Sequence, residues 1–313
     1  MEKKIKHFSS LFRELEAEIG TQDLADLLLQ ALVVSIKAFK TDNKTSFCDQ
    51  FTDLVTIVSN TEPRFGILIY CFYKLQKEFK NGYFQKLPEK KWKGVILKKV
   101  KEILSNFREE IRRLIEYSDE IDVEGKTILI HDNSRTVRNV LAHYKRRGKK
   151  FRVVIAEQDY DKTHNNIERM HKLGIPFQVI PSYMLSHIHD TIDMVFFGGL
   201  TLKDTMNFVM NPGTHGIISE FLVEGTPVYM FINSTKFSLW KSQKKLEVFM
   251  HKHKRIHHAQ PIEYERVKYS HDRVPHTMFT KIITNKGAFT PEQLKIFFDE
   301  RMKKYSYDEV KEG

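Results

Sequence analysis

The stretch GKTILIHDNSRTVRNVLAHYKRRGKKFRVVIA, residues 125–156, decides the fold of this chain. A short apolar run, Thr127–Ile130, is followed by a polar loop, a helical stretch that ends near Lys149-Lys150, and a second apolar run, Phe151–Ala156. Short apolar runs that alternate with helices are typical of parallel strands joined by crossover helices. The stretch therefore predicts one β-α-β unit of a parallel sheet.

The same alternation continues toward the C-terminus. Further strands are expected at Phe177–Ile180, Met194–Gly198, Val228–Ile232 and Met278–Thr284, with glycines and prolines marking the helix ends before them. We predict a Rossmann-like doubly wound domain over residues 121–313. The stretch 235–270, rich in Lys and His, does not fit the alternation, so we expect an excursion from the sheet there.

The first third of the chain has a different texture. Residues 7–118 show helical periodicity without a strand pattern, and the clearest helix repeats apolar residues at three- and four-residue steps from Ile96 to Ile115. The predicted fold class is therefore α/β: an N-terminal all-helical domain, residues 1–120, followed by the Rossmann-like parallel-sheet domain.

The charge balance points to an acidic partner. The chain has 313 residues and a formal net charge of +11, which fits a nucleic acid, a phosphorylated ligand or an acidic protein surface. Lys and Arg concentrate at 90–101, 145–152 and 241–255, without the interleaved aromatic residues of a single-strand-binding platform. A solvated basic surface is therefore favoured over nucleic-acid binding.

Two features bear on location and redox state. The two cysteines, Cys48 and Cys71, lie in helical segments and are expected to be reduced core residues. We see no run of about 18 apolar residues and no signal-peptide pattern after Met1. The expectation is a cytoplasmic protein without a membrane span.

The loops at the carboxyl ends of the strands are where a parallel sheet binds ligands. In the loop His131–Thr136, Ser134 can cap the next helix and Arg135 offers a guanidinium fork for phosphate; a structural cap and a ligand contact are both open. Glu157 ends the second strand, where an acid can bind ribose hydroxyls. Because the Gly-x-Gly-x-x-Gly fingerprint is absent, we expect neither an NAD site nor another cofactor.

Two further segments offer candidate sites. Gly213 and Gly216 flank Thr214, so backbone amides there can approach an anion, although a tight loop explains them equally well. Histidines gather at 251, 253, 257 and 258, with a second pair at 187 and 189. No spaced acid or cysteine closes a ligand set and the neighbouring Lys and Arg repel cations, so no metal is expected.

The order and spacing of these loops resemble the alpha, beta and delta subunits of translation initiation factor 2B. The matching segments are Gly125–His131 with Asn133–Val137, Val154–Glu157, Leu173–Pro176, Asp193–Gly198, Asn211–Thr214, Thr226–Phe231 with Lys236-Phe237, Asp272–Pro275, and Ile282–Gly287 with Pro291. They cover about residues 121–295. The same fold serves methylthioribose-1-phosphate isomerase and ribose-1,5-bisphosphate isomerase, so the resemblance implies either a regulatory subunit or an isomerase.

Departures from the isomerases bear on this choice. The resemblance places Asp132 where the isomerases have a cysteine, and Leu200 where they have an aspartate, a pair thought to move protons or hydride. Met210-Asn211 replaces the family's Asn-Lys, and Glu157 lacks the Arg that follows it in the isomerases. A leucine cannot act as acid, base or acceptor. The resemblance therefore favours a protein without isomerase chemistry.

The function predicted is a non-catalytic, regulatory subunit of a guanine nucleotide exchange complex. The resemblance implies a homodimer or a hetero-oligomer with related subunits, contact with initiation factor 2, and a phosphorylated sugar or nucleotide as ligand. The candidate ligand-binding residues are Asn133, Ser134, Arg135, Glu157, Gly213, Thr214, Lys236 and Asp272. The alternative is a sugar-phosphate isomerase with Asp132 as the proton-transfer group. A basic nucleic-acid binder is a third, disfavoured hypothesis.

Overall fold

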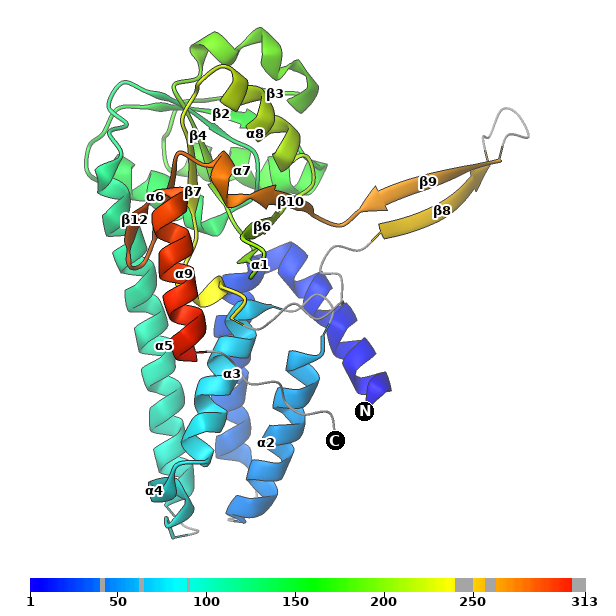
Figure 1. The fold of residues 1–313 in the computed structure, drawn as a ribbon, viewed down its shortest axis with the longest axis vertical. Helices are drawn as coiled ribbons and strands as arrows, with labels where there is room; N and C mark the ends of the chain where they lie inside the picture. Colours follow the sequence, from blue (N-terminus) through cyan, green and yellow to red (C-terminus); the bar gives the residue numbers. More distant parts are fainter. Residues whose placement is uncertain (40–42, 62–64, 89–90, 240–249, 257–262, 306–313) are drawn as a thin grey trace.

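The computed structural model describes residues 1–39, 43–61, 65–88, 91–239, 250–256 and 263–305 (Figure 1). Its N-terminal part holds five helices: α1 Glu2–Ala38, α2 Lys44–Ser59, α3 Gly66–Phe79, α4 Gly82–Gln85 and α5 Trp92–Tyr117. Their apolar faces meet in a core that is rich in aromatic rings, among them Phe47, Phe51, Phe79 and Trp92. The predicted all-helical region is confirmed for the described residues.

Helix α1 is broken at Gly20, whose φ of 78° and ψ of 162° lie outside the helical region. The segment after the break, Ile19–Ala38, is long and apolar enough to cross a membrane by length and composition. The expectation concerned an uninterrupted run of about 18 apolar residues, and this segment contains Gln22, Asp23, Asp26 and Lys37. Leu24, Leu29 and Ile36 are buried in the helical core, which fits a core helix.

The second part is a seven-stranded sheet in the order β12-β11-β7-β4-β1-β2-β3. Its strands are β1 Thr127–Ile130, β2 Arg152–Ala156, β3 Phe177–Ile180, β4 Met194–Gly198, β7 Val228–Phe231, β11 Lys281–Thr284 and β12 Gly287–Phe289. All neighbours are parallel except β11 and β12. The helices are α6 Arg135–Arg146, α7 Tyr160–Lys172, α8 Thr214–Val223 and α9 Pro291–Tyr305. The predicted parallel sheet is confirmed, and β12 is an addition to it.

Five short strands lie outside that sheet. β5 Thr201–Leu202, β6 Asn207–Met210 and β10 Asp272–Pro275 form a small antiparallel sheet that the alternation did not predict. β8 Met250–Ile256 and β9 Glu263–Tyr269 form a hairpin that projects from the body (Figure 1). The expected excursion at 235–270 thus contains this hairpin, whereas Phe237 and Ser238 at its start are buried.

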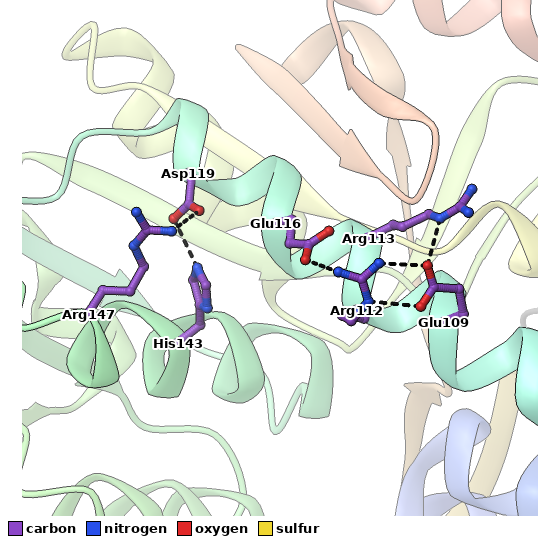
Figure 2. Close-up of polar contacts among 7 residues, drawn as sticks. All are labelled: Glu109, Arg112, Arg113, Glu116, Asp119, His143 and Arg147. Carbon is purple, nitrogen blue, oxygen red and sulfur yellow. Dashed lines mark hydrogen bonds and ion pairs between the residues drawn. The ribbon is translucent and has the colours of Figure 1, made fainter.

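Helix α5 belongs to both parts of the molecule. Trp92 and Val100 lie in the helical core, whereas Leu114 lies in a core beneath the sheet. Figure 2 shows the polar contacts along its C-terminal half, where Glu109 accepts from Arg112 at 2.7 and 2.8 Å. Because one helix serves both cores, the predicted division at residue 120 stays a prediction.

The end of this helix is tied to the sheet by one carboxylate. Asp119, in the 3-10 turn Ser118–Glu120, binds His143 Nε2 at 2.9 Å and Arg147 Nη1 at 2.8 Å, both from the region of α6 (Figure 2). Tyr144 donates its hydroxyl to the Ser118 carbonyl at 2.6 Å from the same helix. These contacts fix the C-terminal end of α5 against the C-terminal end of α6.

Candidate functional site

A cavity of about 410 Å³ lies where the strand order reverses, between β1 and β4. Ligands of open parallel sheets bind at this switch point, beyond the carboxyl ends of the strands. We call its two sides the sheet wall, formed by Asp132–Arg135, Gly198–Leu200 and Lys236, and the helical wall, formed by Arg13, Glu16 and Ile19–Asp23 of α1. The cavity therefore joins the two parts of the chain.

The loop after β1 builds most of the sheet wall. Ser134 caps α6, since its Oγ accepts from the Val137 N–H at 3.3 Å. Asn133 Oδ1 accepts from Arg138 Nη1 at 2.9 Å, and Arg135 forms an ion pair with Asp23 of the helical wall. The predicted residues Asn133, Ser134 and Arg135 thus lie together in the cavity. The cap formed by Ser134 is confirmed, and its contact with a ligand stays a prediction.

Asp132 lies at the bottom of the sheet wall, with 3% of its surface exposed. Its Oδ2 accepts from the Gly198 N–H at 3.1 Å, whereas its Oδ1 has no partner among the described residues. Burial raises the pKa of Asp132 to about 7, partly offset by the Gly198 hydrogen bond and the charge of Lys236. The carboxyl group therefore titrates near neutral pH.

Lys236 is the buried cation of the site. It lies in the 3-10 turn Ser234–Lys236 after β7, and its Nζ donates to the Gly199 carbonyl at 3.1 Å. Burial lowers its pKa to about 8, and the charges of Glu16 and Asp132 oppose this shift. The prediction placed Lys236 in the pocket, and it lines the cavity.

The helical wall was missed by the sequence reasoning. Glu16 faces the site from α1, and burial raises its pKa while the charges of Lys236 and Lys162 lower it. The break at Gly20 sets the direction of the segment that carries Arg13 and Glu16. A glycine inside an apolar helical pattern is the one signal that could have drawn attention to this wall.

Charge is unevenly balanced in the cavity. Six basic side chains line it against three acidic ones, Glu16, Asp23 and Asp132; the basic ones are Arg13, Arg135, Arg138, Lys162, Arg169 and Lys236. Burial lowers the pKa of His271 to about 4, so this lining residue is neutral at neutral pH. Two of the cations, Arg135 and Arg138, lie in the first turn of α6, which is suited to a phosphate group.

Four predicted residues do not line the cavity. Glu157 is exposed, and its N–H pairs with the Ile180 carbonyl at 2.8 Å. Gly213, with φ of 90°, and the buried Thr214 begin α8 beside His131. Asp272 Oδ2 accepts from the His215 N–H at 2.9 Å, so this helix start is already capped by a carboxylate. An anion there would meet the charge of Asp272.

Leu200 lines the cavity directly after Gly198 and Gly199. Its backbone N–H donates to the Val209 carbonyl at 3.0 Å, which fixes this turn against β6. The position where the resemblance expects an aspartate is thus held by a leucine that lines the cavity.

Metal ligands do not gather in the described part of the chain, where no three His, Cys, Asp or Glu side chains come together. His187 and His189 lie in short 3-10 turns, and His189 Nε2 lies 3.1 Å from Asp190. His251 and His253 belong to β8, and His257 and His258 lie outside the described residues.

Comparison with known proteins gives a consistent picture. Residues 18–291 match the sequence profile of the Initiation factor 2 subunit family. The chain is 28% identical over 127 residues to the translation initiation factor eIF2B subunit alpha of Dictyostelium discoideum; the match spans 40% of each protein.

Two solved structures share the fold. The 5-methylthioribose 1-phosphate isomerase of Pyrococcus horikoshii OT3 superposes with a TM-score of 0.72 at 17% identity, over 93% of this chain and 87% of that one. The tetrameric eIF2B-beta2-delta2 complex of C. thermophilum gives a TM-score of 0.70 at 13% identity, over 96% and 94%. At these identities the two structures inform the fold, and the choice between subunit and isomerase rests on the site.

Proposed function

This chain belongs to the Initiation factor 2 subunit family, and we propose that it is a non-catalytic regulatory subunit that binds a phosphorylated sugar or nucleotide. It acts through contacts with copies of itself or with related subunits. The family, the alpha-type relative and the shape of the cavity support this proposal.

Leu200 is the observation that carries the non-catalytic part. An isomerase must move a proton between neighbouring carbons, which requires acid and base groups within reach of the reacting atoms. Leu200 lines the cavity and has no proton to give or take. Loss of one member of a catalytic pair costs several orders of magnitude in rate.

The retained basic residues support ligand binding. Arg135 and Arg138 lie at the first turn of α6, where backbone N–H groups and the helix dipole also favour an anion. Burial lowers the pKa of both guanidinium groups, and to about 10 for Arg138, so both remain charged at neutral pH. A phosphate group at this turn would stabilise these partly buried cations.

The surface near α8 supports the oligomeric part. Tyr183 and Met184 of the turn Ser182–His187 and Leu222 and Val223 of α8 are exposed apolar side chains, and the two elements contact each other. Val223 is 85% exposed and Tyr183 82%. Contiguous exposed apolar surface on a folded protein marks interaction sites. The related tetramer of C. thermophilum shows that subunits of this fold assemble.

The experiment is affinity capture of the tagged chain from its native lysate at low salt, with mass spectrometry of the retained proteins. We expect initiation factor 2 or related 2B-type subunits, and we expect Val223→Asp to lose the related subunits. Val34→Asp, at an exposed valine of α1 (66% exposed), serves as the matched variant and should retain them. Recovery of the chain alone from every lysate condition would contradict the proposal.

The isomerase alternative is supported by one observation. Asp132 lines the cavity with a pKa of about 7, which suits a group that transfers protons at neutral pH. That alternative predicts turnover of a sugar phosphate that is lost in Asp132→Asn. Turnover by the purified chain would put the alternative first.

A further inference from the structure

Asp132 is held rigidly at the bottom of the cavity by both neighbouring elements. Its Oδ2 accepts from the N–H of Gly198, at the end of β4, at 3.1 Å. Its backbone carbonyl accepts from Asn166 Nδ2 of α7 at 3.2 Å. The space beside Gly198 is filled as well, because a Cβ there would lie 2.0 Å from Ser134 Oγ. The carboxyl group is therefore fixed in place before any ligand arrives.

One oxygen of this fixed group is unpaired. Asp132 Oδ1 is buried and has no hydrogen-bond partner within the described residues. The charge of Lys236 acts on Asp132, but its Nζ donates to the Gly199 carbonyl. A buried acceptor without a donor destabilises the folded state, since it has lost water and gained nothing. A ligand that donates a hydrogen bond here would remove that penalty.

The cavity lining combines two kinds of binding group. A phosphate dianion carries acceptors and negative charge, so it fits beside Arg135 and Arg138 and is repelled by an ionised Asp132. A hydroxyl group carries a donor and fits Oδ1. A ligand that satisfies both kinds of group carries a phosphate and a hydroxyl.

We propose that Asp132 selects phosphorylated polyols, such as sugar phosphates, by accepting a hydrogen bond from a ligand hydroxyl at Oδ1. This inference rests on the proposed ligand-binding function and names the residue that separates a sugar phosphate from a simple phosphate. Asp132 occupies the position that the resemblance gives to a cysteine in the isomerases. The selection is thus a property of this chain's own residue.

The test compares two phosphate monoesters of equal charge, ribose 5-phosphate, which has free hydroxyls, and methyl phosphate, which has none. Calorimetric titration gives the affinity of each for the wild type, Asp132→Ala and Asp132→Asn at pH 7.5. Asp132→Asn keeps the size of the side chain and an oxygen that can accept from the Gly198 N–H. It therefore provides a second test if Asp132→Ala does not fold. Thermal unfolding checks the fold of each protein.

We expect the wild type to prefer ribose 5-phosphate, and Asp132→Ala to lose about 10- to 100-fold of affinity for it, the range for a hydrogen bond to a charged group. The affinity of Asp132→Ala for methyl phosphate should equal or exceed that of the wild type, because the substitution removes a negative charge that repels phosphate. Asp132→Asn should lie between, because an amide can donate to the hydroxyl.

The outcomes separate the role of Asp132 from the existence of the phosphate site. An unchanged preference for ribose 5-phosphate in Asp132→Ala, or equal wild-type affinities for the two esters, would overturn the role of Asp132 and leave the phosphate site standing. If the wild type binds neither ester, the ligand-binding part of the proposed function fails, and this inference fails with it.

Discussion

The two walls of the cavity are built in different ways. The sheet wall consists of strand ends and helix caps, in which Asp132 and Ser134 are held by backbone N–H groups. The helical wall depends on the conformation of Gly20 and on the ion pair between Asp23 and Arg135. The sheet wall is therefore part of the folded core. Substitutions in the helical wall should have little effect on the stability of that core.

The largest effect is expected from the charge of Asp132. Its folded pKa of about 7 lies above the ordinary value of 3.8, so the folded state binds more protons and loses stability as pH rises between these values. Asp132→Asn removes this loss. The stability of the variant should exceed that of the wild type by an amount that grows by about 1.4 kcal/mol per pH unit up to pH 7.

Asp193→Asn is the matched control for this titration. Asp193 Oδ2 accepts from the Thr127 N–H at 2.8 Å, which lowers its pKa, so its contribution is present at neutral pH and lost in acid. The two variants should therefore change stability with opposite signs in urea unfolding at pH 4 to 7.5. Parallel curves for Asp132→Asn and the wild type would show that burial does not raise the pKa of Asp132.

A substitution at Gly198 tests the packing of the sheet wall. A Cβ at Gly198 would overlap Ser134 Oγ and Cβ, at 2.0 and 2.6 Å, so Gly198→Ala should cost roughly 3 kcal/mol or more. Gly216 of α8 has nothing within 4 Å, and Gly216→Ala should be neutral or stabilising by up to ~1 kcal/mol. Equal urea midpoints for the two variants would refute the tight packing.

A substitution at Gly20 tests the helical wall. Its φ of 78° and ψ of 162° are accessible almost only to glycine, so Gly20→Ala should cost roughly 1–3 kcal/mol or straighten α1. If α1 straightens, Arg13 and Glu16 move and the affinity for ribose 5-phosphate should fall. Gly94→Ala in α5, which has open space around it, should leave that affinity unchanged. The same loss in both variants would mean that Gly20 has no special role.

The smallest stability effect is expected at the ion pair between the walls. The side chains of Arg135 and Asp23 are 45% and 34% exposed, so breaking the pair should cost at most about 1 kcal/mol. Asp23→Asn should leave ribose 5-phosphate binding intact or tighter, because Arg135 is released. Arg135→Ala should abolish that binding with the fold intact. An unchanged affinity in Arg135→Ala would remove this residue from the site.

The sheet could be predicted from sequence because its central strands, β1 and β4, are buried on both faces. Thr127–Ile130 and Met194–Gly198 are continuous apolar runs, and the structure has them at these bounds. Ser134 was readable as a cap because capping depends on the next three residues alone. Local sequence patterns were thus enough to predict the strands and the helix cap of the sheet wall.

The remainder depends on contacts between distant segments. Glu16 reaches Lys236 only because α1 packs across the carboxyl ends of the strands, which no local pattern encodes. Asp272 caps α8 from 57 residues away, so Gly213 and Thr214 looked available for an anion. Short strands such as Thr201–Leu202 carry too few residues for a periodic signal.

The central claim is that the cavity binds a sugar phosphate without converting it. The most direct measurement is ³¹P NMR of the purified protein with methylthioribose 1-phosphate, followed over hours at pH 7.5. We predict a saturable change of the substrate signal and no product signal. A product signal that grows with time and disappears in Asp132→Asn would contradict the claim and establish an isomerase.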